Sequence, residues 1–126
     1  MKKICIIAEK GKERLEKYIL GRTGKFDAVL EFLFSSDEGA MIDRIHKCYY
    51  DKCGGIVLNA GILSEYSIAV RDAVSAVSGQ IETVEVMQAG SGPESVIAPV
   101  CKGQIKGFGD YAYVLAVKYL TGAEVC

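Results

Sequence analysis

Residues 95–120 read SVIAPVCKGQIKGFGDYAYVLAVKYL, and this stretch carries the strongest indication of the fold class. Its first residues, Ser95–Ala98, have the apolar composition of a short buried strand. The glycine-rich segment at 102–109 predicts a tight turn, because glycine adopts backbone conformations that other residues avoid. Asp110 is placed to cap a helix that ends near Gly122. The order strand, turn, helix is typical of α/β proteins.

The same alternation runs through the rest of the chain. Four further runs have the length and apolar composition of buried strands, at Lys3–Ala8, Asp27–Phe34, Gly55–Asn59 and Ile81–Val86. The helices predicted between them are Lys10–Leu20, a helix that starts at a Ser35–Glu38 capping box, and one that Ser64 caps and that runs to about Val77. This alternation predicts an α/β fold with five parallel strands and helices on both faces, in one domain over residues 1–126.

The composition excludes several classes of protein. Half of the residues are hydrophobic (50%), which is incompatible with a disordered chain. The 15 basic and 16 acidic residues give a net charge of −1, so nonspecific binding to nucleic acid has no electrostatic basis. No apolar run approaches the ~20 residues of a membrane span, and no membrane contact is expected. The five scattered cysteines favour reduced thiols in a cytoplasmic protein over a disulfide framework.

In a parallel α/β sheet, ligands bind beyond the carboxyl ends of the strands. The segments that follow the predicted strands are therefore the candidates for a functional site. They are residues 9–12, 35–39, 59–67, 87–93 and 99–103. The glycines at 102–109 can cradle an anion, but they lack the order of a dinucleotide fingerprint, so a tight backbone crossing explains them better.

Several of these segments resemble one enzyme family. The matching motifs are SDEG at 36–39, IDRIH at 42–46, IVLNAGILSEYS at 56–67, RDA at 71–73, VEVM at 84–87, and the positions Ser95, Ile97, Pro99, Gly103, Ile105, Gly107, Gly109 and Tyr113. In this order they resemble the type II 3-dehydroquinate dehydratases. The resemblance implies a flavodoxin-like three-layer sandwich with a five-stranded parallel sheet, assembled as trimers that pack into a dodecamer.

The resemblance also implies roles for individual residues. Family enzymes remove water from 3-dehydroquinate through an enolate, and the asparagine that holds a water against the enolate oxygen falls on Asn59. The main chain that binds the substrate carboxylate falls on Gln88 and Ala89, so a small polar carboxylate is the expected ligand. The candidates for substrate binding are Asn59, Gly61, Ser64, Met87, Gln88 and Ala89, with Asp72 contributed by a neighbouring subunit.

Other positions depart from the family pattern. The family's base is a tyrosine on a flexible loop after the first strand, helped by an arginine, whereas Tyr18 and Arg14 fall within a predicted helix here. Glu65 replaces one family histidine, and Met87 replaces the general acid, although a thioether cannot donate a proton. These departures predict a divergent homologue with little or no dehydration of 3-dehydroquinate, which binds a small carboxylate or polyol ligand at the carboxyl ends of the strands. The alternatives are an active lyase that uses substitute residues, and a purely structural or regulatory oligomer with a closed pocket.

The possible substitute residues also have ordinary explanations. Asn59 suits a turn at a strand end, and Glu65 is favoured in a first helical turn by the helix dipole. Tyr66 can be a packed aromatic residue. Asn59 and Glu65 remain the candidate catalytic residues. No cofactor is expected, and the spacing of the cysteines and the single histidine is poor for a metal site.

Overall fold

The computed structural model describes residues 1–90 and 92–122. One parallel sheet has the strand order β2–β1–β3–β4–β5. The strands are β1 (Lys2–Ala8), β2 (Ala28–Phe34), β3 (Gly55–Leu58), β4 (Thr83–Met87) and β5 (Gly103–Lys106). The helices are α1 (Arg14–Leu20), α2 (Glu38–Tyr50), α3 (Ile68–Val77) and α4 (Tyr111–Thr121), with short 3₁₀ turns η1 (Gly61–Glu65) and η2 (Ala98–Val100). The predicted fold class is confirmed.

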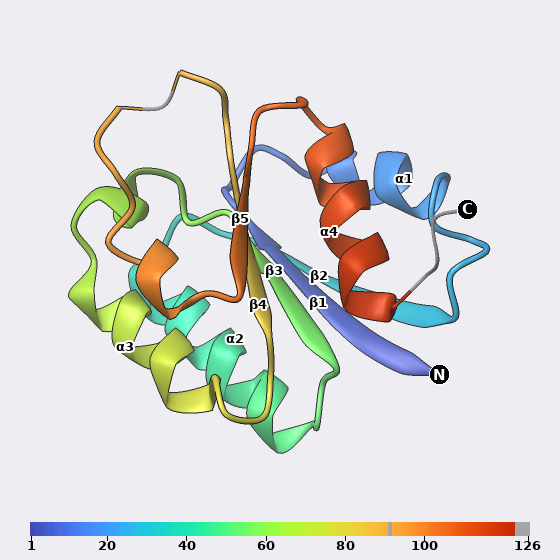
Figure 1. The fold of residues 1–126 in the computed structure, drawn as a ribbon, viewed down its shortest axis with the longest axis horizontal. Helices are drawn as coiled ribbons and strands as arrows, with labels where there is room; N and C mark the ends of the chain where they lie inside the picture. Colours follow the sequence, from blue (N-terminus) through green and yellow to red (C-terminus); the bar gives the residue numbers. More distant parts are fainter. Residues whose placement is uncertain (91, 123–126) are drawn as a thin grey trace.

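Helices cover both faces of the sheet, α1 and α4 on one side and α2 and α3 on the other (Figure 1). The interior strand β1 shows why. Successive side chains of a strand point to opposite faces. Ile4 and Ile6 are buried in the α1–α4 core, while Cys5 and Ile7 are buried in the α2–α3 core. The continuous apolar run of β1 is therefore needed to fill two cores.

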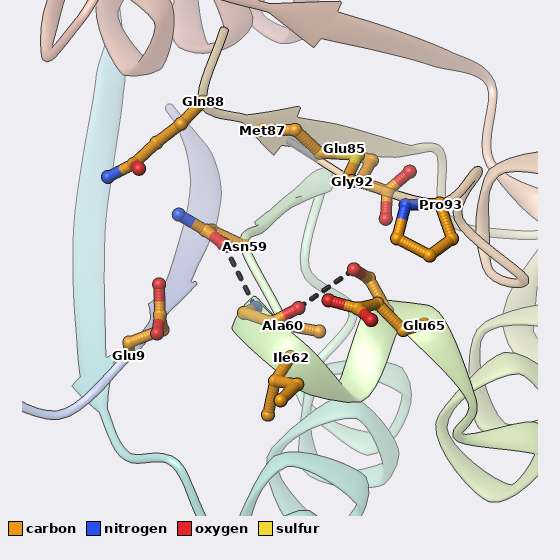
Figure 2. Close-up of a pocket in the computed structure, with 12 residues that line it drawn as sticks. Glu9, Asn59, Ala60, Ile62, Glu65, Glu85, Met87, Gln88, Gly92 and Pro93 are labelled. Atoms are coloured by element: carbon orange, nitrogen blue, oxygen red, sulfur yellow. Dashed lines mark hydrogen bonds between the residues drawn. The ribbon is translucent and has the colours of Figure 1, made fainter. Parts of the chain in front are cut away.

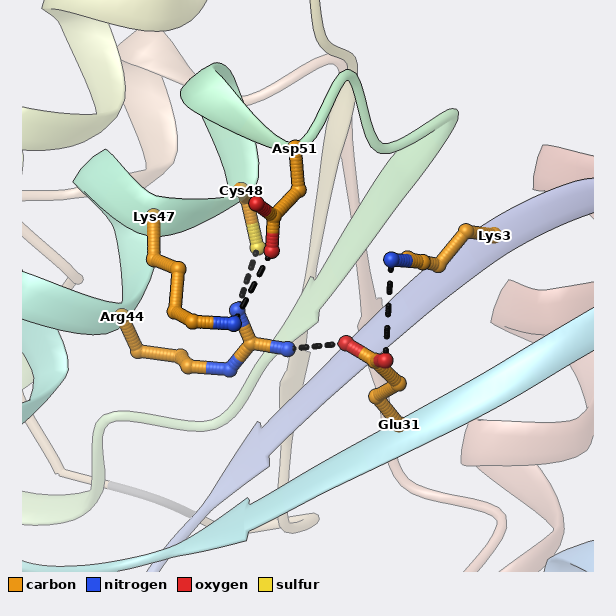
Figure 3. Close-up of polar contacts among 6 residues, drawn as sticks. All are labelled: Lys3, Glu31, Arg44, Lys47, Cys48 and Asp51. Atoms are coloured by element: carbon orange, nitrogen blue, oxygen red, sulfur yellow. Dashed lines mark hydrogen bonds and ion pairs between the residues drawn. The ribbon is translucent and has the colours of Figure 1, made fainter.

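Strand β2 lies at the edge of the sheet, where an ion-pair network joins it to its neighbours. The carboxylate of Glu31 on β2 lies 3.6 Å from Lys3 Nζ on β1 and accepts a hydrogen bond from Arg44 on α2 (Figure 3). Arg44 also lies 3.7 Å from Cys48 Sγ, one turn further along α2. These contacts hold α2 against the edge strand.

The prediction of a fifth strand at Ser95–Ala98 is wrong. The fifth strand, β5, lies further along the chain at Gly103–Lys106. Ser95 Oγ accepts hydrogen bonds from the backbone N–H groups of Ile97 (3.0 Å) and Ala98 (3.2 Å). A serine that binds its own following backbone offers an alternative to strand pairing. This segment therefore forms the turn that leads into η2.

Two predicted helix caps are also wrong. Helix α2 is capped by Asp37, which accepts a hydrogen bond from the N–H of Ala40 at 2.8 Å, and not by a capping box that starts at Ser35. Helix α3 is capped by Ser67, whereas Ser64 donates to the carbonyl of Gly61 within η1 at 2.8 Å. The 3₁₀ turn shifts the start of α3 towards the carboxyl end of the chain.

The first helix also starts later than predicted, at Arg14, after a turn that residues 9–13 form. Asp110 occupies the N-cap position of α4 but makes no capping hydrogen bond with its side chain. None of the helices described for this chain is long and apolar enough to cross a membrane.

Candidate functional site

A hollow of about 250 Å³ lies beyond the carboxyl ends of β3 and β4, and we call it the β3–β4 hollow (Figure 2). It is lined by Glu9, Asn59, Ala60, Gly61, Ile62, Ser64, Glu65, Glu85, Met87, Gln88, Gly92 and Pro93. The parallel sheet brings these residues together, because the carboxyl ends of its strands share one edge. The hollow leaves room for a ligand at this edge of the sheet.

Asn59 follows β3 directly, and its side chain is fixed in one orientation. Its Oδ1 accepts a hydrogen bond from the N–H of Gly61 at 3.0 Å, and its Nδ2 donates to Tyr113 Oη at 2.7 Å. The side chain is almost completely buried (6% exposed). Since an amide nitrogen carries two hydrogens, the bond to Tyr113 leaves the second for a ligand oxygen.

Glu85 on β4 is a carboxylate with no exposed surface that borders the same hollow. It accepts hydrogen bonds from Ser95 Oγ at 2.6 Å and from Gln104 Nε2 at 3.0 Å. A buried carboxylate is costly unless it is hydrogen-bonded, so these two donors are what make its position tenable. Ser95 thus links η2 to the wall of the hollow.

Two further carboxylates border the hollow, Glu9 after β1 and Glu65 at the end of η1. They lie on opposite sides of the turn that contains Ala60 (Figure 2). Glu9 packs over Gly61, where an added Cβ would lie 2.5 Å from Glu9 Cδ. Gly61 also has a φ of 60°, which favours glycine. Glycine at this position therefore allows Glu9 to reach the hollow.

A second hollow, also of about 250 Å³, adjoins the first between α1 and α4, and we call it the α1–α4 hollow. Its lining comprises Lys12, Arg14, Asn59, Val86, Met87, Gln88, Ala89, Gly107, Gly109, Asp110 and Tyr113. Asn59, Met87 and Gln88 border both hollows and form the wall between them. Within residues 1–90 and 92–122, no three His, Cys, Asp or Glu side chains are grouped so that they could hold a metal ion.

Tyr113 on α4 is buried (3% exposed) with its phenol group in the α1–α4 hollow. Burial raises the pKa of Tyr113, and the hydrogen bond from Asn59 partly offsets this effect. The phenol therefore stays protonated near neutral pH. Having accepted a hydrogen bond from Asn59, it still carries its own hydrogen as a donor.

The structure brings most of the candidate residues together. Asn59, Gly61, Ser64, Glu65, Met87 and Gln88 line the β3–β4 hollow, and Ala89 lines the α1–α4 hollow. Asp72 lies outside both hollows of its own chain and pairs with Arg71 on the surface of α3 at 3.1 Å. Tyr66, a possible substitute donor, is 60% exposed and borders neither hollow.

The sequence missed four groups that the structure places at these hollows. Glu9 falls in a segment that the strand order marks as a candidate, but nothing in the sequence singles it out. Arg14 and Tyr18 both lie in α1, as expected, but Arg14 is its first residue and lines the α1–α4 hollow. The ring of Tyr18 packs against Arg22, whose guanidinium carbon lies 3.7 Å from the ring centre. Tyr113 and Glu85 lie in segments that resemble the family, but the sequence does not reveal their roles here, because their hydrogen-bond partners are distant in sequence.

Comparison with known proteins identifies the family. The model of class II dehydroquinases matches residues 6–121. The chain belongs to this family.

Named members are similar over most of the chain. The 3-dehydroquinate dehydratase of Bacillus subtilis is 48% identical over 99 residues, which cover 75% of this chain and 66% of that protein. The enzyme of the same name from Clostridium beijerinckii is 35% identical over 121 residues, or 91% of this chain and 82% of that protein. The type II dehydroquinase structure from Butyrivibrio crossotus is 30% identical, with a TM-score of 0.87, over 94% of this chain and 97% of that one. The chain spans just under two thirds of the length of several curated relatives that it matches, as in the B. subtilis protein.

These relatives contradict the expectation of a homologue with little or no activity. Proteins that are 35% and 48% identical to this chain carry the name 3-dehydroquinate dehydratase. The finding favours the alternative, an active lyase. The expectation was wrong because it treated departures at single positions as a loss of activity.

Proposed function

We propose that this chain is a 3-dehydroquinate dehydratase whose reaction takes place in the β3–β4 hollow. The observation that carries the proposal is the fixed amide of Asn59, which offers one N–H to a ligand between two acidic side chains. A preorganised donor stabilises negative charge as it develops on an oxygen, without any cost of reorientation. Family membership and the names of the relatives support the same reaction.

The reaction requires a proton acceptor and a proton donor. Removal of a proton from the carbon next to the ketone gives an enolate, whose oxygen accepts a hydrogen bond from the free N–H of Asn59. Loss of the β-hydroxyl then forms the carbon–carbon double bond. One carboxylate accepts the proton from carbon, and one proton is delivered to the leaving hydroxyl, so no net proton is gained or lost. The products are an enone and one water molecule. Glu65 and Glu9 border the hollow and can take and return this proton.

We propose that proton transfer in this chain differs from the pattern implied by the family resemblance. Met87 stands at the end of β4, where that pattern has a histidine, and a thioether cannot donate a proton. Only five residues separate β1 from α1, so no long loop carries a tyrosine there. The carboxylates of Glu9 and Glu65 can take over proton transfer from the missing histidine and tyrosine.

We further propose that the substrate contacts Gly61, Ser64, Met87, Gln88 and Ala89 beside Asn59, as the position of these residues around the hollows supports. The proposed assembly is a homo-oligomer, either a trimer or a dodecamer built from trimers, in which Asp72 reaches a neighbouring subunit's site. Its 64% exposed side chain on α3 is compatible with this role. The free thiols of Cys5, Cys48 and Cys53 favour a reducing compartment such as the cytoplasm.

The test is a steady-state assay that follows 3-dehydroshikimate by its absorbance. We expect Glu65→Gln and Glu9→Gln each to lower kcat by about 10²-fold or more, which is typical of a lost acid or base. Glu16→Gln on the exposed side of α1 is the matched control and should leave kcat unchanged. If both site variants turn over as fast as the wild type, the two carboxylates are not the proton carriers.

A further inference from the structure

Three cysteine side chains meet where the end of α2 packs against the sheet. Cys48 lies in the last turn of α2, Cys53 lies two residues before β3, and Cys5 lies on β1. All three belong to the buried core that includes α2 and α3, and the thiol of Cys48 is hydrogen-bonded to the other two thiols. They are not grouped so that they could hold a metal ion. The proposed dehydration uses none of these nucleophilic groups.

The turn that ends α2 holds Cys48 and Cys53 against each other. The N–H of Cys53 donates to the carbonyl of Cys48 at 2.9 Å, and the N–H of Lys52 donates to the carbonyl of Tyr49 at 3.2 Å. These two bonds form a Schellman motif, in which the residues at the positions of Cys48 and Cys53 often pack together. Lys52 has a φ of 58°, the left-handed conformation that this motif usually gives to glycine.

This geometry fits the requirements of a disulfide. The N···O distance of 2.9 Å between Cys53 and Cys48, with standard bond lengths, limits the separation of their Cα atoms to about 6.8 Å. The Cα atoms of disulfide-bonded cysteines lie roughly 4.4–6.8 Å apart. Because the two thiols are already hydrogen-bonded to each other, a disulfide between them needs little movement of the backbone.

One thiol of the pair can be reached from the surface. Cys53 is 5% exposed, whereas Cys48 and Cys5 have no exposed surface. Cys53 borders a surface hollow of about 490 Å³, which is lined by Tyr49, Tyr50, Lys52, Cys53, Gln80 and Ile81. This hollow has room for one end of a small peptide disulfide, whose carboxylates are attracted by the ammonium group of Lys52.

We propose that Cys48 and Cys53 form a reversible disulfide by exchange with a low-molecular-weight disulfide of the glutathione class, and that Cys53 reacts first. The thiolate of Cys53 attacks one sulfur of the small disulfide, whose S–S bond breaks, and the first small thiol leaves. The thiolate of Cys48 then attacks the sulfur of Cys53 and releases the second small thiol. The two protein thiols are oxidised, the small disulfide is reduced, and both protons end on the small thiols.

The surroundings of the pair make this exchange slow. Burial raises the pKa of the Cys53 thiol to about 12, so little thiolate is present at neutral pH. The hydrogen bond to Cys5 and burial raise the pKa of Cys48, whereas the positive charge of Arg44, with Nη1 3.7 Å from Cys48 Sγ, opposes this rise (Figure 3). The pair therefore responds to a sustained change in the thiol–disulfide balance. Since it lies near the amino end of β3, away from the β3–β4 hollow, the proposal is independent of the proposed function.

Peptide mapping of the full chain tests the proposal. Wild-type protein is held overnight with oxidised glutathione at about pH 8.5, where more thiolate is present, then quenched with acid, alkylated and digested with trypsin. Trypsin cleaves after Lys47, Lys52 and Arg71, so the two cysteines fall in the separate peptides 48–52 and 53–71. We expect mass spectrometry to find these two peptides linked, with the loss of two alkylatable thiols, and to find them separate after reduction.

Three variants test the order of the two steps. Cys48→Ser removes the second thiol, so a glutathione adduct should remain on Cys53. Cys53→Ser should form neither the link nor an adduct at Cys48, because Cys48 has no exposed surface. Cys101→Ser is the matched control, since Cys101 is a partly exposed thiol beside η2, and it should form the link as the wild type does. A sample unfolded in concentrated urea shows that the reagent is active.

The proposal is overturned if peptides 48–52 and 53–71 of the native wild type stay unlinked. It is also overturned if the peptide 4–10, which contains Cys5, is linked to 48–52 in their place. A Cys48→Ser protein without an adduct, or a Cys53→Ser protein that gains one at Cys48, would contradict the assignment of Cys53 as the first thiol to react.

Discussion

The side-chain amide of Asn59 donates a 2.7 Å hydrogen bond to the phenol oxygen of Tyr113, across 54 positions of the sequence. Both side chains are buried, at 6% and 3% exposure. The bond joins the end of β3 to the first turn of α4 and fixes the amide at the wall between the two hollows.

Removal of the phenol oxygen tests this relationship. Tyr113→Phe keeps the ring in the core but leaves an N–H of Asn59 without its acceptor, which should lower the free energy of unfolding by about 1–3 kcal/mol. The amide is then free to turn, so kcat should fall while KM changes little. Denaturant unfolding and steady-state kinetics measure the two effects. Tyr111→Phe, at a 46% exposed position one residue past the cap, is the control and should change neither.

The hydroxyl of Ser95 donates a hydrogen bond to the buried carboxylate of Glu85 and accepts hydrogen bonds from two backbone N–H groups. We expect Ser95→Ala to lower the free energy of unfolding by about 1–3 kcal/mol, because a buried charge loses one of its two donors. Ser75→Ala on the exposed side of α3 provides the comparison. Equal stability of the two variants in urea would show that Ser95 does not support Glu85.

Gly61 allows Glu9 to reach the β3–β4 hollow. Gly61→Ala introduces a Cβ at a φ of 60° and 2.5 Å from Glu9 Cδ, so the carboxylate must move. We expect a loss of about 1 kcal/mol in stability from the left-handed backbone, and a larger relative loss of kcat. Gly24→Ala, where an added Cβ meets nothing within 4 Å, should leave kcat unchanged. A Gly61→Ala protein with full activity would remove Glu9 from the mechanism.

Alkaline pH should destabilise the protein. Burial raises the pKa of the Cys53 and Cys101 thiols to about 12, and it also raises the pKa of Tyr113. In the unfolded chain these groups ionise near their ordinary values, about 8.5 for a thiol and about 10 for a phenol. Their neutral forms therefore stabilise the fold below those values, and this stabilisation is lost as the pH rises towards about 12.

Urea unfolding at about pH 8 and about pH 10 measures this effect. The free energy of unfolding should fall by roughly 1 kcal/mol per pH unit for each thiol that ionises only on unfolding. Cys101→Ser, at a partly exposed position, should reduce the slope by up to that amount. A free energy of unfolding that does not change over this range would contradict the assignment of these groups as buried and neutral.

The sequence predicts the architecture because the signals for it are local. The apolar run that forms β1 fills two cores, and the alternation of such runs with helical spacing leads to a parallel sheet. The position of Asn59 follows from the same logic, since it comes directly after a buried strand. Ser95–Ala98 failed as a strand because a serine hydroxyl bound the backbone locally, and composition alone does not reveal that choice.

Much of the site could not be predicted from the sequence, because its contacts join residues that are distant in the chain. The apolar spacing of α4 places Tyr113 in the core but does not identify the partner of its hydroxyl group, which lies on another element. Arg14 seemed to belong to a helix interior, and its place at the second hollow depends on where α1 starts. The buried carboxylate of Glu85 is tenable only through Ser95 and Gln104, which the fold brings to it.

The most direct test of the central claim is a time course of purified protein with 3-dehydroquinate, followed by NMR. We predict that 3-dehydroshikimate appears far faster than in buffer alone, and that Asn59→Ala slows its formation by about 10²-fold or more, as expected when a donor to a developing oxyanion is lost. No product beyond the buffer rate, or equal rates for the wild type and Asn59→Ala, would contradict the assignment of this hollow as the dehydratase site.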